Sequence, residues 1–212
     1  MGSVDKSTQE VQRSLDEQLD NEPSEIIGWD DISNAIIAAR LDTSTGRLDY
    51  DYFNAGVNFN SNARYPDEPV VIPIQLWHRL KYGSGAVLRP HFHWLQEQSA
   101  VPNFILAYKK TSYGTATVKE TDFTNYTLMK WDSNVFTYPG SGVFAQITKF
   151  PEIDISDMTI SGSVDIVLFR DSADASGLFG ASDPVGTDVT VKYNDSHAQL
   201  NQERGSRQEF IK

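Results

Sequence analysis

The sequence predicts a mainly β protein: a jelly-roll-like antiparallel β-sandwich preceded by an N-terminal helical or extended arm. Three observations carry this prediction. Before Pro23, apolar residues recur every four positions, which is a helical period. After about residue 34, short apolar or alternating runs are separated by turns rich in Gly, Pro, Asn and Asp. No second long helical pattern and no repeat of fixed period follows, so alternating β-α-β units are not expected.

The arm covers residues 1–33 and contains one short helix. Ser7 and Glu10 have the spacing of a capping box at the start of a helix. The apolar stripe that follows consists of Val11, Leu15 and Leu19. A stripe this narrow does not stabilise an isolated helix in water. We therefore expect these three residues to anchor the arm on a partner.

Charge is concentrated in the same segment. Residues 1–33 contain nine acidic side chains against Lys6 and Arg13, a net charge of −7 out of −11 for the 212-residue chain. An acidic leading segment is repelled by phosphate, so nucleic acid is not an expected partner. Apolar runs are all shorter than the ~18 residues of a membrane span, and the absence of cysteine excludes disulfides and thiol catalysis. The beginning of the chain does not have the pattern of a signal peptide.

Residues 34–212 are predicted to form one sandwich domain. The candidate strands are 36–41, 47–53, 55–59, 70–77, 86–96, 103–110, 126–131, 142–150, 164–170 and 188–193. Pro73 indicates a sheet edge or a bulge within its strand. The loop from Asp171 to Gly186 is long enough to be functional or mobile.

One motif suggests a metal site. Gly85, His91, His93 and Glu97 have the spacing of the first half of the cupin metal motif. The last three share strand parity and could face the interior of a barrel, and two imidazoles with a carboxylate suit a divalent transition metal.

The second half of that motif is missing. Its closing glycine would fall at Phe104, and Val189 stands where a histidine should follow Pro184 and Gly186. His197 is the remaining downstream histidine that could act as a late ligand. The simpler interpretation is that His91 and His93 hydrogen-bond within a wet strand face or a subunit interface.

Other functional motifs are weak or missing. The chain has no nucleophile elbow, phosphate-binding glycine loop or zinc-protease helix motif. Asp171 to Asp174 falls short of a calcium loop, and we expect a solvated loop there. Trp77, Trp94 and Trp131 could form a sugar-binding platform if exposed together, although core filling is the expected role in strands.

Three stretches carry a resemblance to a known family. They are Arg89–Trp94 (RPHFHW), Val164–Asp171 (VDIVLFRD) and Ser196–Lys212, which contains Gly-Ser-Arg and ends in Lys. Together they resemble small virion proteins of tailed bacteriophages, over roughly residues 70–212. The resemblance implies a β-sandwich virion component that assembles as a homotrimer and has no enzymatic activity.

The C-terminus also predicts assembly. Arg204 and Arg207 make this end basic, opposite in charge to the arm, and Phe210 and Ile211 place apolar side chains at the very end. These four residues are the candidate interface residues, because a basic end that meets an acidic arm helps to set the orientation of neighbouring copies.

The predicted function is therefore structural: a capsid decoration or head-fibre subunit located in the virion, without catalytic residues or cofactor. Its expected partners are other copies of itself and other virion proteins of the capsid or tail. A membrane is not an expected partner. The first alternative is a tail fibre or adaptor component. The second is a cupin-like metal-dependent enzyme using His91, His93 and Glu97. A third is a carbohydrate-binding module, which would take a host-surface glycan.

Overall fold

The computed structural model shows an all-β sandwich. It describes residues 28–35, 40–41, 48–51, 54–76, 80–98, 100–112, 114, 116, 122–134, 140, 142–159 and 162–200. No helix in these ranges is long and apolar enough to cross a membrane. The predicted arm helix lies outside them, as do Val11, Leu15, Leu19 and the whole segment after Leu200.

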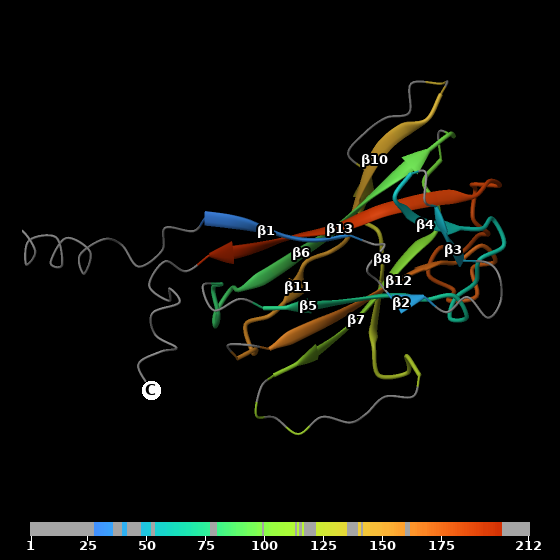
Figure 1. Cartoon of the computed structure of the whole chain (residues 1–212). Helices are drawn as coiled ribbons and strands as arrows, with labels where there is room; N and C mark the ends of the chain where they lie inside the picture. Colours follow the sequence, from blue (N-terminus) through green and yellow to red (C-terminus); the bar gives the residue numbers. More distant parts are fainter. Residues whose placement is uncertain are drawn as a thin grey trace, which may run out of the picture.

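The described ranges contain thirteen strands in two antiparallel sheets (Figure 1). The larger sheet consists of β1 (Gly28–Ala35), β3 (Leu48–Asp51), β4 (Gly56–Phe59), β6 (Val87–Gln96), β9 (Ser133–Asn134), β10 (Phe144–Lys149), β11 (Ile153–Asp154) and β13 (Val189–Leu200). The smaller sheet consists of β2 (Arg40–Leu41), β5 (Val70–Gln75), β7 (Phe104–Thr111), β8 (Thr127–Lys130) and β12 (Ser163–Arg170).

The strand order is that of a jelly roll. The centre of the larger sheet runs β4-β13-β6-β10, and the smaller sheet runs β5-β12-β7-β8. The chain therefore passes from one sheet to the other at almost every step, and its last long strand returns to lie beside its first. The predicted antiparallel β-sandwich is confirmed, and the predicted arm before it lies outside the described residues.

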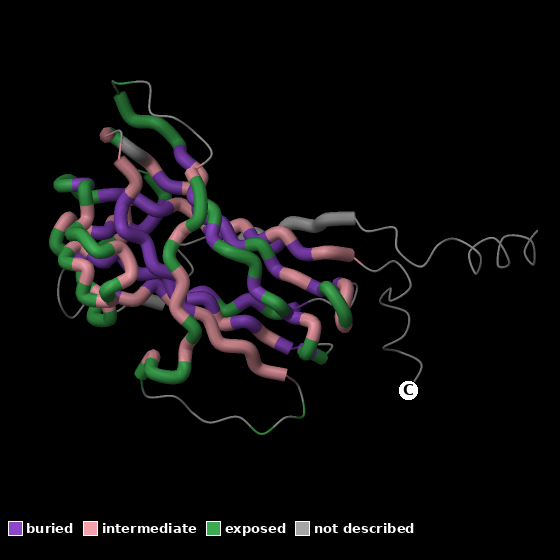
Figure 2. Tube along the Cα trace, turned by 180° about the vertical axis from the view of Figure 1, so that it is seen from behind, coloured by how far each residue is buried: buried purple, intermediate pink, exposed green. Residues whose placement is uncertain are grey.

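The space between the sheets is filled by apolar side chains (buried stretches in Figure 2). From the larger sheet, Leu88, Phe92 and Trp94 of β6 point inward and are fully buried. From the smaller sheet, Leu106 and Ile166 meet them in the same cluster. Trp94 packs edge to face on Phe104, with ring centroids 5.5 Å apart. The interior of the sandwich is thus a packed core.

A second apolar cluster covers the outer face of the smaller sheet. It is built on Ile105, Ala107, Val167 and Phe169, which are buried although they point away from the main core. Aromatic and aliphatic side chains from the flanking loops cover them: Tyr65, Phe123, Tyr126, Leu178 and Phe179 among others. Two of these residues come from the long loop after β12, so that loop is an apolar cover for the sheet.

Two boundaries differ from the prediction. Residues 28–33 belong to the predicted arm, but β1 pairs along its whole length with β13, so the sandwich starts earlier than residue 34. The last strand was expected to end at residue 193, but it continues to Leu200. Pro73 agrees with its prediction: β2 pairs only with Val70 and Val71, so within the described residues Pro73 lies at a local sheet edge.

Candidate functional site

The outer face of the larger sheet carries a histidine cluster on two neighbouring strands. His91 and His93 alternate with the inward-pointing Phe92 and Trp94 along β6 and therefore face outward. On β13, Asp195 lies in register with His91, and His197 follows two residues later on the same face. The ladder between the two longest strands of the sheet thus brings these side chains together.

A β-bulge in β13 is what turns the second half of the cluster outward. Val191 pairs with Trp94 and points into the core, but the next pair joins Tyr193 to His93, so Lys192 is an extra residue. One extra residue reverses the alternation of side chains beyond it. Without this bulge, Asp195 and His197 would point into the apolar core.

The distances within the cluster are short. The Nε2 atom of His91 lies 3.6 Å from Oδ2 of Asp195, which is too long for a hydrogen bond between these two atoms. The rings of His91 and His197 meet edge to face with centroids 4.6 Å apart. His93 stacks on Tyr193, with centroids 4.1 Å apart and planes inclined by 19°. His91, Asp195 and His197 each offer one ligand atom such that all three atoms lie within 4.8 Å of one another.

Burial lowers the pKa values of His91 and His93. His91 is only 6% exposed. Loss of water lowers the pKa of its imidazole from 6.5 to about 4, because burial penalises the charged ring more than the carboxylate of Asp195 stabilises it. Burial lowers the pKa of His93 in the same way. At neutral pH His91 is therefore uncharged, and one ring nitrogen carries a free lone pair.

A pocket of about 300 Å³ adjoins the cluster. His91 and His197 form part of its wall, and the charged residues around it are Arg89, Asp132, Lys149 and Glu152. The guanidinium of Arg89 donates from Nε to Oε1 of Glu152 at 2.6 Å, across the pocket lining. The cluster is thus reachable from a polar depression.

The cupin prediction is wrong in its geometry. His91 and His93 share a face as expected, but this is the outer face of the sandwich, and the interior holds Leu88, Phe92 and Trp94 instead. Glu97 lies beyond the end of β6 and is exposed. The carboxylate that the fold places beside His91 is Asp195.

Asp195 was missed for two reasons. Its strand was expected to end at residue 193, and the register that pairs it with His91 joins residues far apart in the chain. The alternating spacing of Asp195 and His197 was the available signal, since it repeats the spacing of His91 and His93. The late ligand suggested for the motif, His197, does lie in the cluster.

The remaining candidates have structural roles. Trp94 is fully buried, so it cannot contribute to an exposed sugar platform, and its indole donates to Oγ1 of Thr148 at 2.9 Å. In the suggested calcium loop, the Asp171 carboxylate accepts hydrogen bonds from the backbone amides of Ala175 and Ser176, at 2.8 and 2.9 Å. This carboxylate is therefore used to shape the loop. Trp77 lies outside the described residues.

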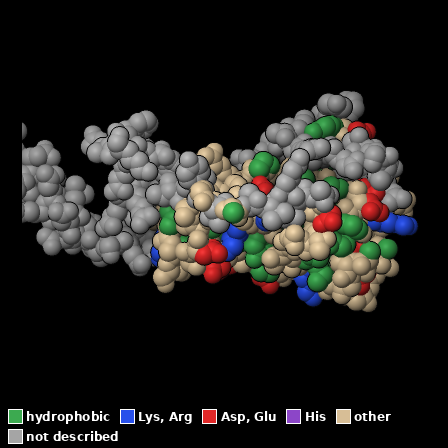
Figure 3. Space-filling model, turned by 90° about the horizontal axis from the view of Figure 1, so that it is seen from below, with side chains coloured by type: hydrophobic (Ala, Val, Ile, Leu, Met, Phe, Trp, Pro, Cys, Tyr) green, Lys and Arg blue, Asp and Glu red, His purple; other side chains and the backbone are tan. Residues whose placement is uncertain are grey.

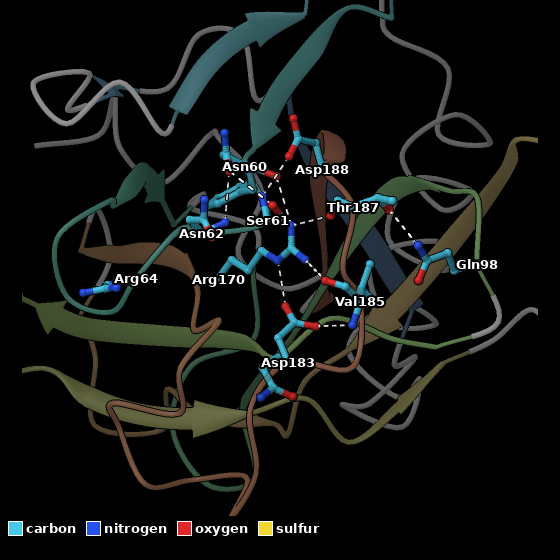
Figure 4. A network of polar contacts seen from close by, with 12 residues as sticks. Asn60, Ser61, Asn62, Arg64, Gln98, Arg170, Asp183, Val185, Thr187 and Asp188 are labelled. Carbon is cyan, nitrogen blue, oxygen red and sulfur yellow. Dashed lines mark hydrogen bonds and ion pairs between the residues drawn. The ribbon is translucent and has the colours of Figure 1, made fainter.

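The long loop after β12 is held by a buried ion pair (Figure 4). Arg170 donates from Nε to Oδ2 of Asp183 at 2.7 Å, and the exposed fractions of the two side chains are 0% and 2%. Its other nitrogens donate to the carbonyl oxygens of Phe59, Val185 and Thr187. All three guanidinium nitrogens are used within the chain, so this network fixes a loop and is not a binding site.

The candidate interface residues at the two ends of the chain lie outside the described ranges, but the strands that lead to them are placed. Gly28 at the start of β1 pairs with Leu200 at the end of β13. In Figure 1, β1 begins and β13 ends side by side at the left of the sandwich. The acidic segment before Gly28 and the basic segment after Leu200 therefore join the sandwich at one end.

Comparisons with known proteins reveal weak structural likeness and no sequence relative. The chain matches no protein-family model and no curated protein. A solved structure of TmCBM61 in complex with beta-1,4-galactotriose is similar at 15% identity and a TM-score of 0.22, over 84% of this chain and 88% of that chain. At this TM-score the likeness carries no argument.

Proposed function

We propose that this chain is a structural, non-enzymatic virion protein of a tailed bacteriophage, a capsid decoration or head-fibre subunit that assembles as a homotrimer. The sequence resemblance over three stretches supports the proposal, and a jelly roll is a fold that occurs in viral capsid proteins. The rival position within the virion is a tail fibre or adaptor component.

The observation that carries the proposal is that the two terminal segments, of opposite net charge, attach to the same end of the sandwich. Gly28 and Leu200 are backbone partners, so residues 1–27 (seven acidic against two basic side chains) and residues 201–212 (three basic against two acidic) both join the sandwich at this pair. A partner that docks at this end of the sandwich lies beside the points where both tails begin. Opposite charges at one end favour a defined orientation between a subunit and its neighbours.

The face of the sandwich seen in Figure 3 fits a body that is held by its tails. In the view of Figure 3, Lys and Arg side chains are scattered and lie near Asp and Glu, without a broad patch of one sign. The apolar side chains at the tip of β10, Val143 and Phe144, are 56% and 38% exposed. They offer a small second contact on the body.

Immunogold labelling of intact particles tests the proposal and its rival together. We expect gold on the capsid surface for a decoration or head-fibre subunit and on the tail for the rival. Protein that is absent from purified particles by mass spectrometry would overturn both. Analytical ultracentrifugation of the purified full chain should give a trimer.

A truncation tests the role of the arm. Residues 1–27 should be removed and no more, because deletion into residues 28–35 would destroy β1 and its pairing with β13. The truncated chain should remain a folded trimer that no longer attaches to particles that lack the protein. A truncated chain that falls apart into monomers and still attaches would show that the arm is an oligomerisation element, which contradicts this assignment.

A further inference from the structure

The histidine cluster on the outer face of the larger sheet is not needed for the proposed assembly and has the composition of a metal site. Within it, the imidazoles of His91 and His197 and the carboxylate of Asp195 come from adjacent strands, and their ligand atoms lie within 4.8 Å of one another. This group mixes nitrogen and oxygen donors, so it is more selective than a group of surface acids. Its chemistry matches transition ions better than Ca²⁺ or Mg²⁺, which prefer oxygen ligands alone.

The spacing of the ligands fits a metal after small side-chain rotations. In a tetrahedral zinc site with bonds of about 2.0–2.2 Å, neighbouring ligand atoms lie about 3.3–3.6 Å apart. The pair formed by Nε2 of His91 and Oδ2 of Asp195 is 3.6 Å apart. His197 completes the triangle within 4.8 Å, a gap that rotation of its partly buried side chain can close.

The backbone holds this triangle in place. His91 and Asp195 are direct partners across the antiparallel ladder of β6 and β13, and His197 is the next outward residue on β13. The bulge at Lys192 sets the parity that turns both β13 ligands outward. Ligands on paired strands are positioned with less freedom than ligands on a loop.

We propose that His91, Asp195 and His197 bind one divalent transition metal ion, of the Zn²⁺ or Fe²⁺ class, on the outer face of β6 and β13. Three protein ligands leave at least one coordination position for water, which can enter from the pocket of about 300 Å³ that His91 and His197 line. An ion held there ties the two longest strands of the sheet together, and metal bound only to the folded chain stabilises it. This proposal is independent of the proposed function.

The test uses the full-length chain with any affinity tag removed and all metal stripped with EDTA. Isothermal titration with Zn²⁺ should show one ion per chain, and titration with Co²⁺ should give the visible absorption bands of a low-symmetry nitrogen and oxygen site. The thermal unfolding temperature should rise when Zn²⁺ is added and return to that of the metal-free chain when EDTA is added. If the intact chain binds neither Zn²⁺, Co²⁺ nor Fe²⁺ under anaerobic conditions, the proposal is overturned without any variant.

Near-isosteric variants assign the ligands. Asp195→Asn and His197→Gln should each weaken Zn²⁺ binding by at least about 100-fold, because loss of an outer-shell partner alone costs about 10–100-fold. His93→Gln is the matched control, since His93 lies on the same face but stacks on Tyr193. It should bind Zn²⁺ like the parent chain.

Two results would contradict the assignment. If His93→Gln loses the ion while Asp195→Asn keeps it, the ligands are a different set that includes His93. If all three variants bind like the parent, the ion binds elsewhere on the chain. Far-UV circular dichroism of the stripped variants shows whether they are folded, and the Co²⁺ spectrum of the parent chain is informative even when one variant is not.

Discussion

Arg170 shows how much one buried side chain contributes to this sandwich. Its guanidinium binds the carboxylate of Asp183 and three carbonyl oxygens, entirely out of contact with water. Arg170→Leu should lower the free energy of unfolding by about 3–5 kcal/mol, because it leaves the carboxylate of Asp183 buried without its cation. Urea denaturation of parent and variant measures this loss.

Two controls accompany this prediction. Glu152→Gln breaks the pair with Arg89, whose side chains are both half-exposed, and should cost no more than about 1 kcal/mol. The double variant Arg170→Leu with Asp183→Leu should recover part of the loss, because no unpaired charge remains. A single Arg170→Leu variant as stable as the Glu152→Gln control would refute the importance of this network.

Asp165 gives a pH dependence of defined sign. It lies half-buried on β12, between Pro73 of β5 and Lys109 of β7 in the ladder register. Burial raises the pKa of its carboxyl above 3.8, and the positive charge of Lys109 only partly opposes this shift. The folded state therefore binds the proton more tightly than the unfolded state. Ionisation of Asp165 lowers the free energy of unfolding of the protein as pH rises from below 3.8 through the raised pKa.

Asp165→Asn should accordingly be more stable than the parent at pH 7, by less than about 1 kcal/mol because solvent screens a half-buried group. The difference in stability should shrink toward zero well below pH 3.8, where the Asp165 carboxyl of the parent is protonated in both the folded and the unfolded state. Asp157→Asn is the matched control, since it removes an exposed ion pair with Lys110 and should be neutral or slightly destabilising. Thermal melts at several pH values measure both. A variant that is less stable than the parent at pH 7 would mean that attraction to Lys109 outweighs burial.

At the scale of elements, β4 fits against β13 only because its first residue has no side chain. A Cβ atom on Gly56 would collide with the carbonyl oxygen of Val191 and approach Cγ2 of Thr190 to 2.8 Å. Both contacts lie beside the bulge that orients the histidine face. Gly56→Ala should lower the free energy of unfolding by about 1–3 kcal/mol, the usual cost of overpacking.

Gly186→Ala is the matched control, because no atom lies within 4 Å of its added Cβ. Its free energy of unfolding should stay within about 0.5 kcal/mol of that of the parent chain. Chemical denaturation compares the two variants directly. Equal free energies of unfolding for the two variants would mean that β4 and β13 can move apart at this point without a loss of stability.

Most of the long strands follow from local pattern, because alternation and β-branched runs mark them. The stretch predicted as 86–96 forms β6 at Val87–Gln96, and 164–170 forms most of β12. Besides the two-residue strands β9 and β11, the prediction lacks β1 and the end of β13, which are polar stretches without an apolar period. β1 and the end of β13 are strands because they pair with each other, which is a long-range cause.

The candidate site was predictable only in part. Spacing along the chain shows that His91 and His93 share a face, but both faces of β6 carry aromatic side chains, so spacing alone does not tell inside from outside. The partner Asp195 depends on strand register, and its direction depends on the bulge at Lys192. Neither property has a local signature in the sequence.

For the whole molecule, the tails should make attachment sensitive to salt. Charges on exposed segments are screened over about 10 Å at 0.1 M salt and about 3 Å at 1 M. Attachment of the full chain to particles that lack it should weaken several-fold when NaCl is raised from about 0.05 M to about 0.5 M, while the trimer persists. Co-sedimentation and light scattering measure the two quantities. Attachment that salt does not change would show that apolar contacts of Val11, Leu15 and Leu19 dominate instead.

The pairing of Gly28 with Leu200 makes the path of the chain through the sandwich almost a closed circuit. A linker of a few residues between these two positions, with new ends opened in the exposed turn at Ser84 and Gly85, would leave the order of strands in both sheets unchanged. Such a circularly permuted body would fold without either tail. The shape of the sandwich is thus separable from the chemistry of its ends, so tails of other design could be attached to the same body.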